Sequence, residues 1–270
     1  MALSLTQVQA LFGATAPAAP AADAARAIPA LRRATEAGAE AKGIARERKD
    51  PVTLSALAQF RTALDAAPSI GAALQDPRIL KVLLPALGLA GEEGKAGLVR
   101  QALLSNPADP KGLAARLGGA WKAAAATLGV HATGLAGLRD PAMVQRLSDA
   151  YVKYQYRRGL DQEQPGLADA LYVLESAGRA RSPYDVLGDP VLRRVVTGAL
   201  GLPDQIAVQS VEAQGRALSA RLRIETLQDA RVVRKLAERY LIAAAGRAAA
   251  TAASAPSDPL SVITGLAIRA

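Results

Sequence analysis

The 270-residue chain contains no cysteine and one histidine, His131. The lack of cysteine excludes disulfides, thiolate metal ligands and cysteine nucleophiles. One histidine leaves no conventional zinc site and no Ser-His-Asp or Ser-His-Glu triad within a single chain. No apolar run reaches the roughly 20 residues that a membrane-spanning helix needs. Carboxylate-only magnesium or calcium sites stay possible, but no acidic loop with the spacing of such a site is present in the sequence. We therefore expect no catalytic centre of these kinds, no metal or other cofactor, and no membrane span.

Aromatic residues are also scarce. They make up 3% of a chain that is 50% hydrophobic, so the core must be built from alanine, leucine, valine and isoleucine. Alanine has the highest helix propensity, and alanine-rich interfaces let helices approach closely. A chain of this length buries roughly three-quarters of the surface that it exposes when unfolded. The composition predicts an all-α fold, a compact multi-helix protein with no sizeable sheet.

The most informative feature is a 14-residue repeat. The stretch that begins at Asp76-Pro77 returns without a gap at Asp189-Pro190, and seven of its 14 positions are identical. The two tails read Ala-Leu-Gly-Leu and contain Gly88 and Leu89 in the first copy, Gly201 and Leu202 in the second. A weaker echo follows, in which Asp140, Val144, Leu147 and Tyr151 recur as Asp229, Val233, Leu236 and Tyr240. Recurrence at this long spacing predicts two related helical lobes rather than a solenoid of short units.

Six Asp-Pro pairs predict helix starts, at Asp50, Asp76, Asp109, Asp140, Asp189 and Asp258. Aspartate is a favourable N-cap, and proline fits the first helical position because it has no N–H to leave unpaired. Gly88 and Gly201 fit the left-handed position that ends a helix, and a leucine follows each. We expect helices near residues 51–66, 76–87, 91–104, 109–117, 119–128, 140–159, 165–178, 189–200, 203–220, 228–248 and 258–268. The alternating segment 221–225 is compatible with a short strand.

The expected organisation has four parts. Residues 1–49 form an N-terminal extension with an Ala/Pro-rich linker at 14–22 and exposed helix-forming residues at 24–49. Residues 50–160 form the first helical lobe, 161–248 the second, and 249–270 a tail with a short helix. Both ends carry apolar residues at helical spacing, and such tethered stripes are either packed arms or partner-binding segments. The candidate partner-binding residues are Leu5, Val8, Phe12, Leu260, Ile263 and Leu266.

Neither a nucleotide-binding loop nor a nucleophile elbow is present in the sequence. Residues 91–95 resemble a phosphate loop only superficially, and we expect a turn before the 91–104 helix. His131 is expected in a loop between two helices, where a surface or capping role fits better than a catalytic one. The stretch 151–158 interleaves three tyrosines with basic residues and resembles a stacking patch for nucleic acid. Tyr151 shares a helix face with Leu147, however, so packing in the core or at an interface fits better.

The formal net charge of +9 is spread evenly along the chain. Nucleic-acid binders more often concentrate their charge, so a solubilising surface fits better and nucleic acid is not an expected partner. The basic residues at 231–239 lie opposite an apolar stripe, which describes an amphipathic helix that could also dock an acidic partner. The segment 1–12 lacks the positive leader of a secretory signal, and we expect no Sec-dependent export.

Several short segments follow one another in an order that is specific to one protein family, although each segment alone is weak evidence of the relationship. They are Gln59-Phe60-Arg61, residues 76–89, 99–103, Asp109-Pro110 and 113–117, then Tyr154-Gln155, Ala170-Leu171-Tyr172, 189–202 and 227–245. Together they resemble the family called domain of unknown function 1217, found in flagellated alphaproteobacteria, over about residues 50–246. The sequence departs from the family's pattern at 118–123, which has one aromatic residue, Trp121, and in the aliphatic tails of the repeat.

The resemblance implies a flagellar or motility protein without an assigned reaction or catalytic residues. We therefore expect a non-enzymatic helical protein that contacts flagellar proteins in assembly or structure, in the bacterial cytoplasm or the flagellum. Its N-terminal extension would suit passage through the flagellar export apparatus. Two hypotheses of other classes stay open: a basic nucleic-acid-binding regulator that uses the 151–158 surface, and an enzyme with an unrecognised carboxylate–arginine site.

Overall fold

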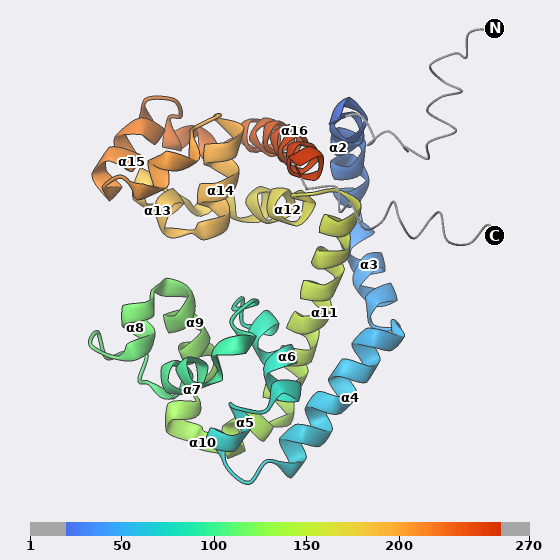
Figure 1. Cartoon of the computed structure of the whole chain (residues 1–270), viewed down its shortest axis with the longest axis vertical. Coiled ribbons are helices and arrows are strands. Elements are labelled where there is room, and N and C mark those ends of the chain that lie inside the picture. The colour runs from blue at the N-terminus through green and yellow to red at the C-terminus, as the bar shows by residue number, and fades with distance from the viewer. Residues whose placement is uncertain (1–19, 255–270) are drawn as a thin grey trace, which may run out of the picture. The chain divides into compact units, whose positions relative to one another are not determined.

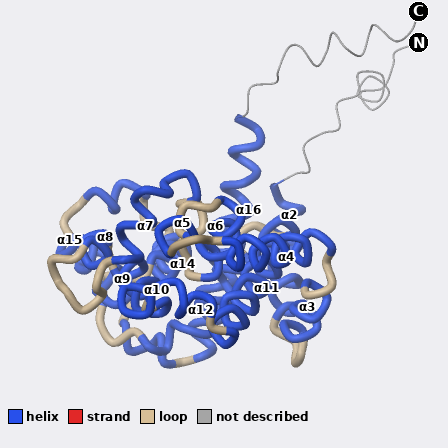
Figure 2. The backbone as a smooth tube through the Cα atoms, turned by 90° about the horizontal axis from the view of Figure 1, so that it is seen from below, coloured by secondary structure: helices blue, strands red, loops and turns tan. Residues whose placement is uncertain are grey.

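The computed structural model describes residues 20–254, and within that range every regular element is a helix. Figure 2 shows the described backbone as helices joined by loops. Contacts divide the chain into two units. We call residues Glu36–Leu160 the middle unit, and the chain up to Thr35 together with Asp161 onward the split unit. The expected all-α class is confirmed.

The middle unit is built around one cluster of buried, mostly aliphatic side chains, with Phe60, Trp121 and Tyr151 as aromatic members. Helices α4 and α6 pack against each other, and the Arg139 side chain closes the end of α4 by donating hydrogen bonds to three carbonyls of residues 64, 65 and 67. Figure 1 shows these elements in light blue to yellow-green. They are α3 (Ala39–Glu47), α4 (Pro51–Ala66), α5 (Ile70–Ala73), α6 (Pro77–Ala86), η1 (Glu93–Lys95), α7 (Ala96–Leu104), α8 (Leu113–Leu117), α9 (Gly119–Leu128), α10 (Val130–Arg139) and α11 (Pro141–Glu163), whose last turn belongs to the split unit.

The split unit is organised by its last helix, α16 (Ala230–Ser254), which packs against α2 (Pro20–Ala34), α12 (Leu167–Ser176) and α14 (Pro190–Ala199). Its core joins aliphatic residues of α12, α14 and α16 with Tyr240. The orange and red part of Figure 1 shows α14 and α16 with the shorter elements around them. These are η2 (Ala177–Arg179), α13 (Pro183–Gly188), η3 (Asp204–Val208), α15 (Val211–Ser219) and η4 (Ile224–Gln228).

Both copies of the repeat begin with the same aspartate cap. Asp76 accepts a hydrogen bond of 2.8 Å from the backbone N–H of Arg78 at the start of α6. Asp189 accepts bonds of 2.9 and 3.0 Å from the N–H groups of Val191 and Leu192 at the start of α14. Proline follows each cap at the first helical position, as the sequence predicts. The carboxylate therefore satisfies N–H groups that have no partner within the helix.

Both copies also end in the same way. Gly88 and Gly201 have positive φ angles of 75° and 62°. The N–H of Leu89 bonds to the carbonyl of residue 84 at 2.8 Å, and that of Leu202 to the carbonyl of residue 197 at 2.9 Å. With the bonds of Gly88 to residue 85 and Gly201 to residue 198, these are the contacts of the Schellman motif. The repeat thus determines one helix from its first residue to its last.

Two expectations based on local pattern are wrong. The segment 221–225 is not a strand, because the chain turns into η4 at Ile224, and Leu222 and Ile224 pack into the core of the split unit. The pair Asp109-Pro110 does not start a helix. Asp109 accepts from the N–H of Lys111 in a turn, α8 begins only at Leu113, and the hydroxyl of Ser105 accepts the N–H of residue 114 at 3.0 Å.

The expected helix over 203–220 is divided into η3 and α15. The side chain of Ser210 caps α15, and the chain at Gln209 is extended with ψ of 166°. The expected 91–104 helix likewise becomes η1 and α7. His131 lies in the first turn of α10 rather than in a loop, and its side chain is exposed. Helices α5, α10 and α13 were not expected. The division before α15 follows from the hydrogen bonds of Ser210 and Gln214, whereas α5 and α13 begin at local serine caps, Ser69 and Ser182.

The N-terminal segment differs most from the expected exposed extension. Helix α2 begins at Pro20, inside the expected linker 14–22, and buries Ala27 and Leu31 against the rest of the split unit. Helix α3 packs in the middle unit, where Tyr156 of α11 lies against Gly43. The candidate partner-binding residues at the two ends, Leu5, Val8, Phe12, Leu260, Ile263 and Leu266, lie outside the described residues, as does the expected 258–268 helix.

Candidate functional site

A pocket of about 80 Å³ opens in the split unit beside the second copy of the repeat. Helix α14 contributes Arg193, Arg194 and Thr197 to its wall. The apolar part comes from the chain after α14, from η3 and from α15, and includes Leu202, Ile206 and Leu218. Drug-sized ligands occupy pockets of roughly 300–1,000 Å³, whereas a cavity that holds a single water measures about 10–15 Å³. This pocket has room for the end of one aliphatic side chain.

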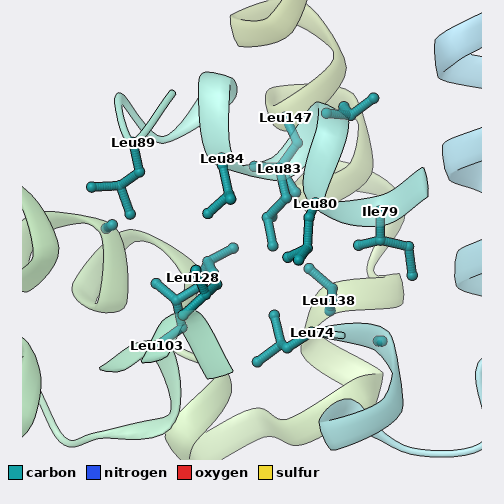
Figure 3. Packing of buried hydrophobic residues seen from close by; sticks show 14 of the residues in the cluster. Leu74, Ile79, Leu80, Leu83, Leu84, Leu89, Leu103, Leu128, Leu138 and Leu147 are labelled. Carbon is teal, nitrogen blue, oxygen red and sulfur yellow. The ribbon is translucent and has the colours of Figure 1, made fainter. Parts of the chain in front are cut away.

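The pocket lies on a face of α14 whose counterpart on α6 is covered. In the repeat, Arg193, Thr197 and Leu202 occupy the positions of Leu80, Leu84 and Leu89. These three leucines are 2%, 0% and 5% exposed in the middle unit, whereas Arg193 is exposed and Thr197 and Leu202 are half-buried. Figure 3 shows Leu84 and Leu89 turned toward Leu128 of α9, with Leu138 of α10 beside Leu80.

The opposite face of the two repeated helices is buried in both units. Ile79, Val82 and Leu83 of α6 are buried in the core of the middle unit. Their counterparts, Leu192, Val195 and Val196, are buried in the core of the split unit. The copies therefore share one packing face and differ on the other, where an apolar surface has become a pocket with a basic rim.

The wall formed by η3 is held in place by a buried amide. Gln214 of α15 is 6% exposed, and its side-chain nitrogen donates to the carbonyls of Ala207 at 3.3 Å and Gln209 at 2.8 Å. The hydroxyl of Ser210, which precedes the first residue of α15, accepts a hydrogen bond from the N–H of residue 213 at 3.3 Å. Because the amide satisfies carbonyls that leave the helical pattern, it keeps the break between η3 and α15, and hence the shape of the pocket.

Arg194 is anchored by a bidentate ion pair. Its Nε and Nη2 atoms donate to the two carboxylate oxygens of Asp169 at 2.6 and 2.7 Å, and the Tyr240 hydroxyl donates to Oδ2 of the same carboxylate at 2.8 Å. The hydrogen bond to Asp169 raises the pKa of the Arg194 guanidinium above its usual range. Arg193, in contrast, has no ion-pair partner among the described residues. The rim therefore carries one neutralised cation and one that is available to an anion.

Tyr240 fills the space between three helices behind this pair. Its side chain is 3% exposed, and the guanidinium of Arg247 lies 5.9 Å from its ring centroid. Glycines on α14 and before α12 allow the approach, since a Cβ on Gly198 would lie 3.0 Å and one on Gly166 2.8 Å from ring carbons. Burial, followed by the bond to Asp169, raises the pKa of Tyr240 to about 12.

Replacing Tyr240 with phenylalanine is expected to reduce the loss of folding stability that alkaline pH causes. An unfolded tyrosine titrates near pH ~10, whereas Tyr240 keeps its proton until about pH 12 in the folded protein. The stability that the raised pKa of Tyr240 contributes is therefore fully present below pH ~10. It is lost as the pH rises from there to the folded pKa, because the unfolded state releases the proton first. Urea unfolding followed by far-ultraviolet circular dichroism, at about pH 9 and about pH 11.5, measures this loss. An equal loss in wild type and Tyr240→Phe would contradict the assignment.

The residues that the sequence analysis singled out as a nucleic-acid patch do not share one open surface. Tyr151 is 1% exposed in the core of the middle unit, and Tyr156 lies against Gly43 of α3. Lys153 forms an ion pair with Glu40 at 3.2 Å. Tyr151 and its counterpart Tyr240 are both buried, which confirms the packing role inferred from the echo of the repeat.

The repeat residues Asp76, Pro77, Gly88 and Leu89, with Asp189, Pro190, Gly201 and Leu202, begin and end their helices as described above. Among them Leu202 also lines the pocket. Within the described part of the chain, no group of three or more histidine, aspartate or glutamate side chains is placed to hold a metal ion. No helix of that part has the length and apolar character needed to cross a bilayer. The chemistry that the pocket itself offers is apolar contact together with guanidinium recognition of an anion.

The described part of the chain is thus all-helical and contains a capped helix in two copies. The second copy lines a pocket the size of a side chain. The family model described as "Protein of unknown function (DUF1217)" matches residues 86–233, more than half of the chain. The protein belongs to this family. The sequence likeness noted for residues 50–246 extends beyond the matched range on both sides.

The chain is also similar to a solved structure, the crystal structure of protein AGR_C_984 from Agrobacterium tumefaciens. The two share 23% sequence identity over 82% of this chain and 93% of the other, with a TM-score of 0.63. At this identity the likeness shows a shared fold. No curated protein matches the sequence.

Sequence reasoning missed the pocket, although the repeat contains a signal for it. Where one copy of a helix has Leu80 and Leu84 and the other has Arg193 and Thr197, the second copy cannot bury that face in the same way. The identical positions of the repeat show what the two copies share, and the polar residues at 193 and 197 show where they differ.

Proposed function

We propose that this protein is a non-enzymatic, helical component of flagellar assembly or structure that acts through contacts with other proteins. The observation that carries the contact role is the open face of α14, where a side-chain-sized pocket has a basic rim. The pocket has a size that suits a protruding side chain of a protein partner better than a free metabolite.

The flagellar part of the proposal is supported by the sequence likeness to proteins of flagellated alphaproteobacteria. The partners are flagellar proteins, and the site of action is the bacterial cytoplasm or the flagellum. The mixture of aliphatic lining and guanidinium groups suits a reversible interface, in which a buried apolar contact provides affinity and charges provide selectivity.

The test is a deletion strain of the motile source organism, with swimming measured in soft agar. We expect reduced swimming that the wild-type gene restores. A control variant, Arg234→Glu on the exposed side of α16, is expected to restore swimming as well. Normal swimming of the deletion strain would contradict the proposal.

Proteomics of purified hook–basal bodies and of the culture supernatant, compared with an export-deficient strain, separates the two locations. Detection in either fraction supports a structural or exported role. Absence from both fractions, together with impaired swimming, would leave a cytoplasmic role such as chaperone or regulator.

A further inference from the structure

We infer that the open face of α14 docks an acidic amphipathic helix of a partner protein, with one aliphatic side chain in the pocket and a carboxylate against Arg193. The inference deepens the proposed function and rests on its claim that the protein acts through protein contacts. Its evidence is the difference between the two copies of the repeat, together with the charge and exposed apolar surface around the second copy.

The middle unit shows what covers the equivalent face in the first copy. Between α7 and α11 the chain forms three further helices, α8, α9 and α10, and Leu128 and Leu138 from the last two pack in one cluster with Leu80, Leu84 and Leu89. In the split unit, α15 ends at Ser219 and α16 begins at Ala230, with only η4 between them. Among the described residues, α8, α9 and α10 thus have no counterpart beside α14.

The rim of the pocket selects the charge of the occupant. Arg193 and Arg194 are the charged groups among the lining side chains that the structure describes. Arg194 is neutralised by Asp169, whereas Arg193 is exposed and has no ion-pair partner in the described part of the chain. At the position of Arg193 the first copy has Leu80, which meets other leucines. A helix that docks here therefore needs a carboxylate where α9 and α10 present apolar side chains.

Exposed apolar residues extend the pocket along α15. Val211 is 51% exposed and lies one and two turns before Gln214 and Leu218, so all three share one stripe of that helix. Val208, next to the lining residue Ala207, is 88% exposed. Together with the pocket, these side chains form a short apolar track of the kind that receives residues spaced three and four apart on an amphipathic helix.

Other occupants fit less well. A nucleic acid offers phosphates to Arg193 but no aliphatic side chain for the pocket. A second copy of this chain carries a net charge of +9 and would be repelled by the basic rim. An acidic helix meets both the apolar and the charged requirement.

The experiment uses the purified full-length chain and three fluorescein-labelled synthetic helical peptides. The first has leucines three and four residues apart with glutamates beside them, the second replaces each glutamate with glutamine, and the third with lysine. Fluorescence anisotropy at low salt is expected to show the glutamate peptide binding at least about tenfold more tightly than the glutamine peptide, and the lysine peptide not binding.

Two variants test the site itself. Arg193→Glu reverses the free charge, and Thr197→Leu restores the residue of the first copy and fills the pocket; each is expected to weaken binding of the glutamate peptide by about tenfold or more. The control Arg234→Glu makes the same charge change at an exposed residue of α16 and is expected to alter binding by less than about twofold. Circular dichroism of each variant confirms that it is folded.

Four outcomes of the peptide-binding and self-association measurements would overturn the inference. They are equal binding of the glutamate and glutamine peptides, equal effects of Arg193→Glu and Arg234→Glu, no binding of any peptide, and self-association of the chain that Arg193→Glu abolishes. A rise of about tenfold or more in peptide affinity when Leu260, Ile263 and Leu266 are replaced with serine would also overturn it, because the chain's own tail would then be the occupant. Peptide binding is measured in vitro and swimming in cells. Failure of the docking inference is therefore distinguishable from failure of the proposed function, which normal swimming of the deletion strain would show.

Discussion

Replacing Leu84 with alanine is expected to lower the free energy of unfolding by about 2–5 kcal/mol. Leu84 is 0% exposed and lies in the cluster that joins α6 to α9 and α10. The substitution removes apolar atoms from the core and leaves a cavity, because neighbouring helices relax only partly. Urea unfolding followed by fluorescence measures the loss in the relevant unit, since Trp121 is the sole tryptophan and belongs to the same cluster.

The matched control is Thr197→Ala, at the same position of the second copy. Thr197 is half-buried and lines the pocket, and its hydroxyl donates to the carbonyl of Arg193 at 2.7 Å. Alanine has the higher helix propensity, which offsets the lost contacts, so the change in stability is expected to stay within about 0.5 kcal/mol. Because Trp121 lies in the other unit, circular dichroism follows the urea unfolding of Thr197→Ala. Similar losses for both variants would mean that the α14 face is as closely covered as the α6 face, contrary to the basis of the docking inference.

The second large effect is expected for Gly166→Ala, with a loss of about 2–4 kcal/mol. Gly166 has a φ of 84°, and an added Cβ would lie 2.8 Å from Cε1 of Tyr240 and 3.2 Å from Cβ of Ala244. Backbone strain costs about 1–2 kcal/mol in the left-handed region, and steric overlap with a ring that can shift adds about 1–2 kcal/mol, within the usual range for overpacking. Because Tyr240 holds Asp169, the substitution should also loosen the support of Arg194.

The control for Gly166→Ala is Gly201→Ala in the same unit. Gly201 has a φ of 62°, but no atom lies within 4 Å of an added Cβ, so only the backbone strain of about 1–2 kcal/mol applies. Urea unfolding followed by circular dichroism compares the two, and hydrogen exchange of α16 shows whether the helix around Tyr240 opens. Equal stability losses without faster exchange in α16 would show that the Tyr240 ring moves aside at little cost.

The two copies of the repeat illustrate how one capped helix supports two roles. In the middle unit, side chains from both faces of α6 are buried in the core. In the split unit, α14 keeps the packing face and the caps but offers Arg193 and Thr197 where leucines are buried in the other copy. We interpret the first copy as architectural and the second as architectural on one face and available for binding on the other.

Much of the helical fold follows from local signals. The ranges 51–66 and 119–128 were predicted to the residue, and α6 and α14 each begin one residue after the predicted start and end one residue before the predicted end. These helices have an aspartate cap, a left-handed glycine, or both, and such signals act within a few residues of the helix end. Where the same signal failed, at Asp109-Pro110, the aspartate instead caps a turn, and the structure uses Ser105 to support the next helix.

The candidate site could not be predicted in the same way, because its parts are distant in sequence. Asp169 and Arg194 are 25 residues apart, and Asp169 and Tyr240 are 71 apart. The expected 203–220 helix would have removed the pocket altogether, and it is the Gln214 amide that holds η3 out of a continuous helix. Neither relation leaves a period or motif in the sequence.

The sequence by itself determined the all-α class, the helices with strong caps, the absence of cysteine chemistry and the identity of the repeated element, because propensity, capping and composition act over a few residues. The tertiary structure alone decided which face of each repeated helix is covered, that α2 packs onto α16, and that Asp169, Arg194 and Tyr240 meet. Burial depends on which other segments pack nearby, and local sequence does not specify those neighbours.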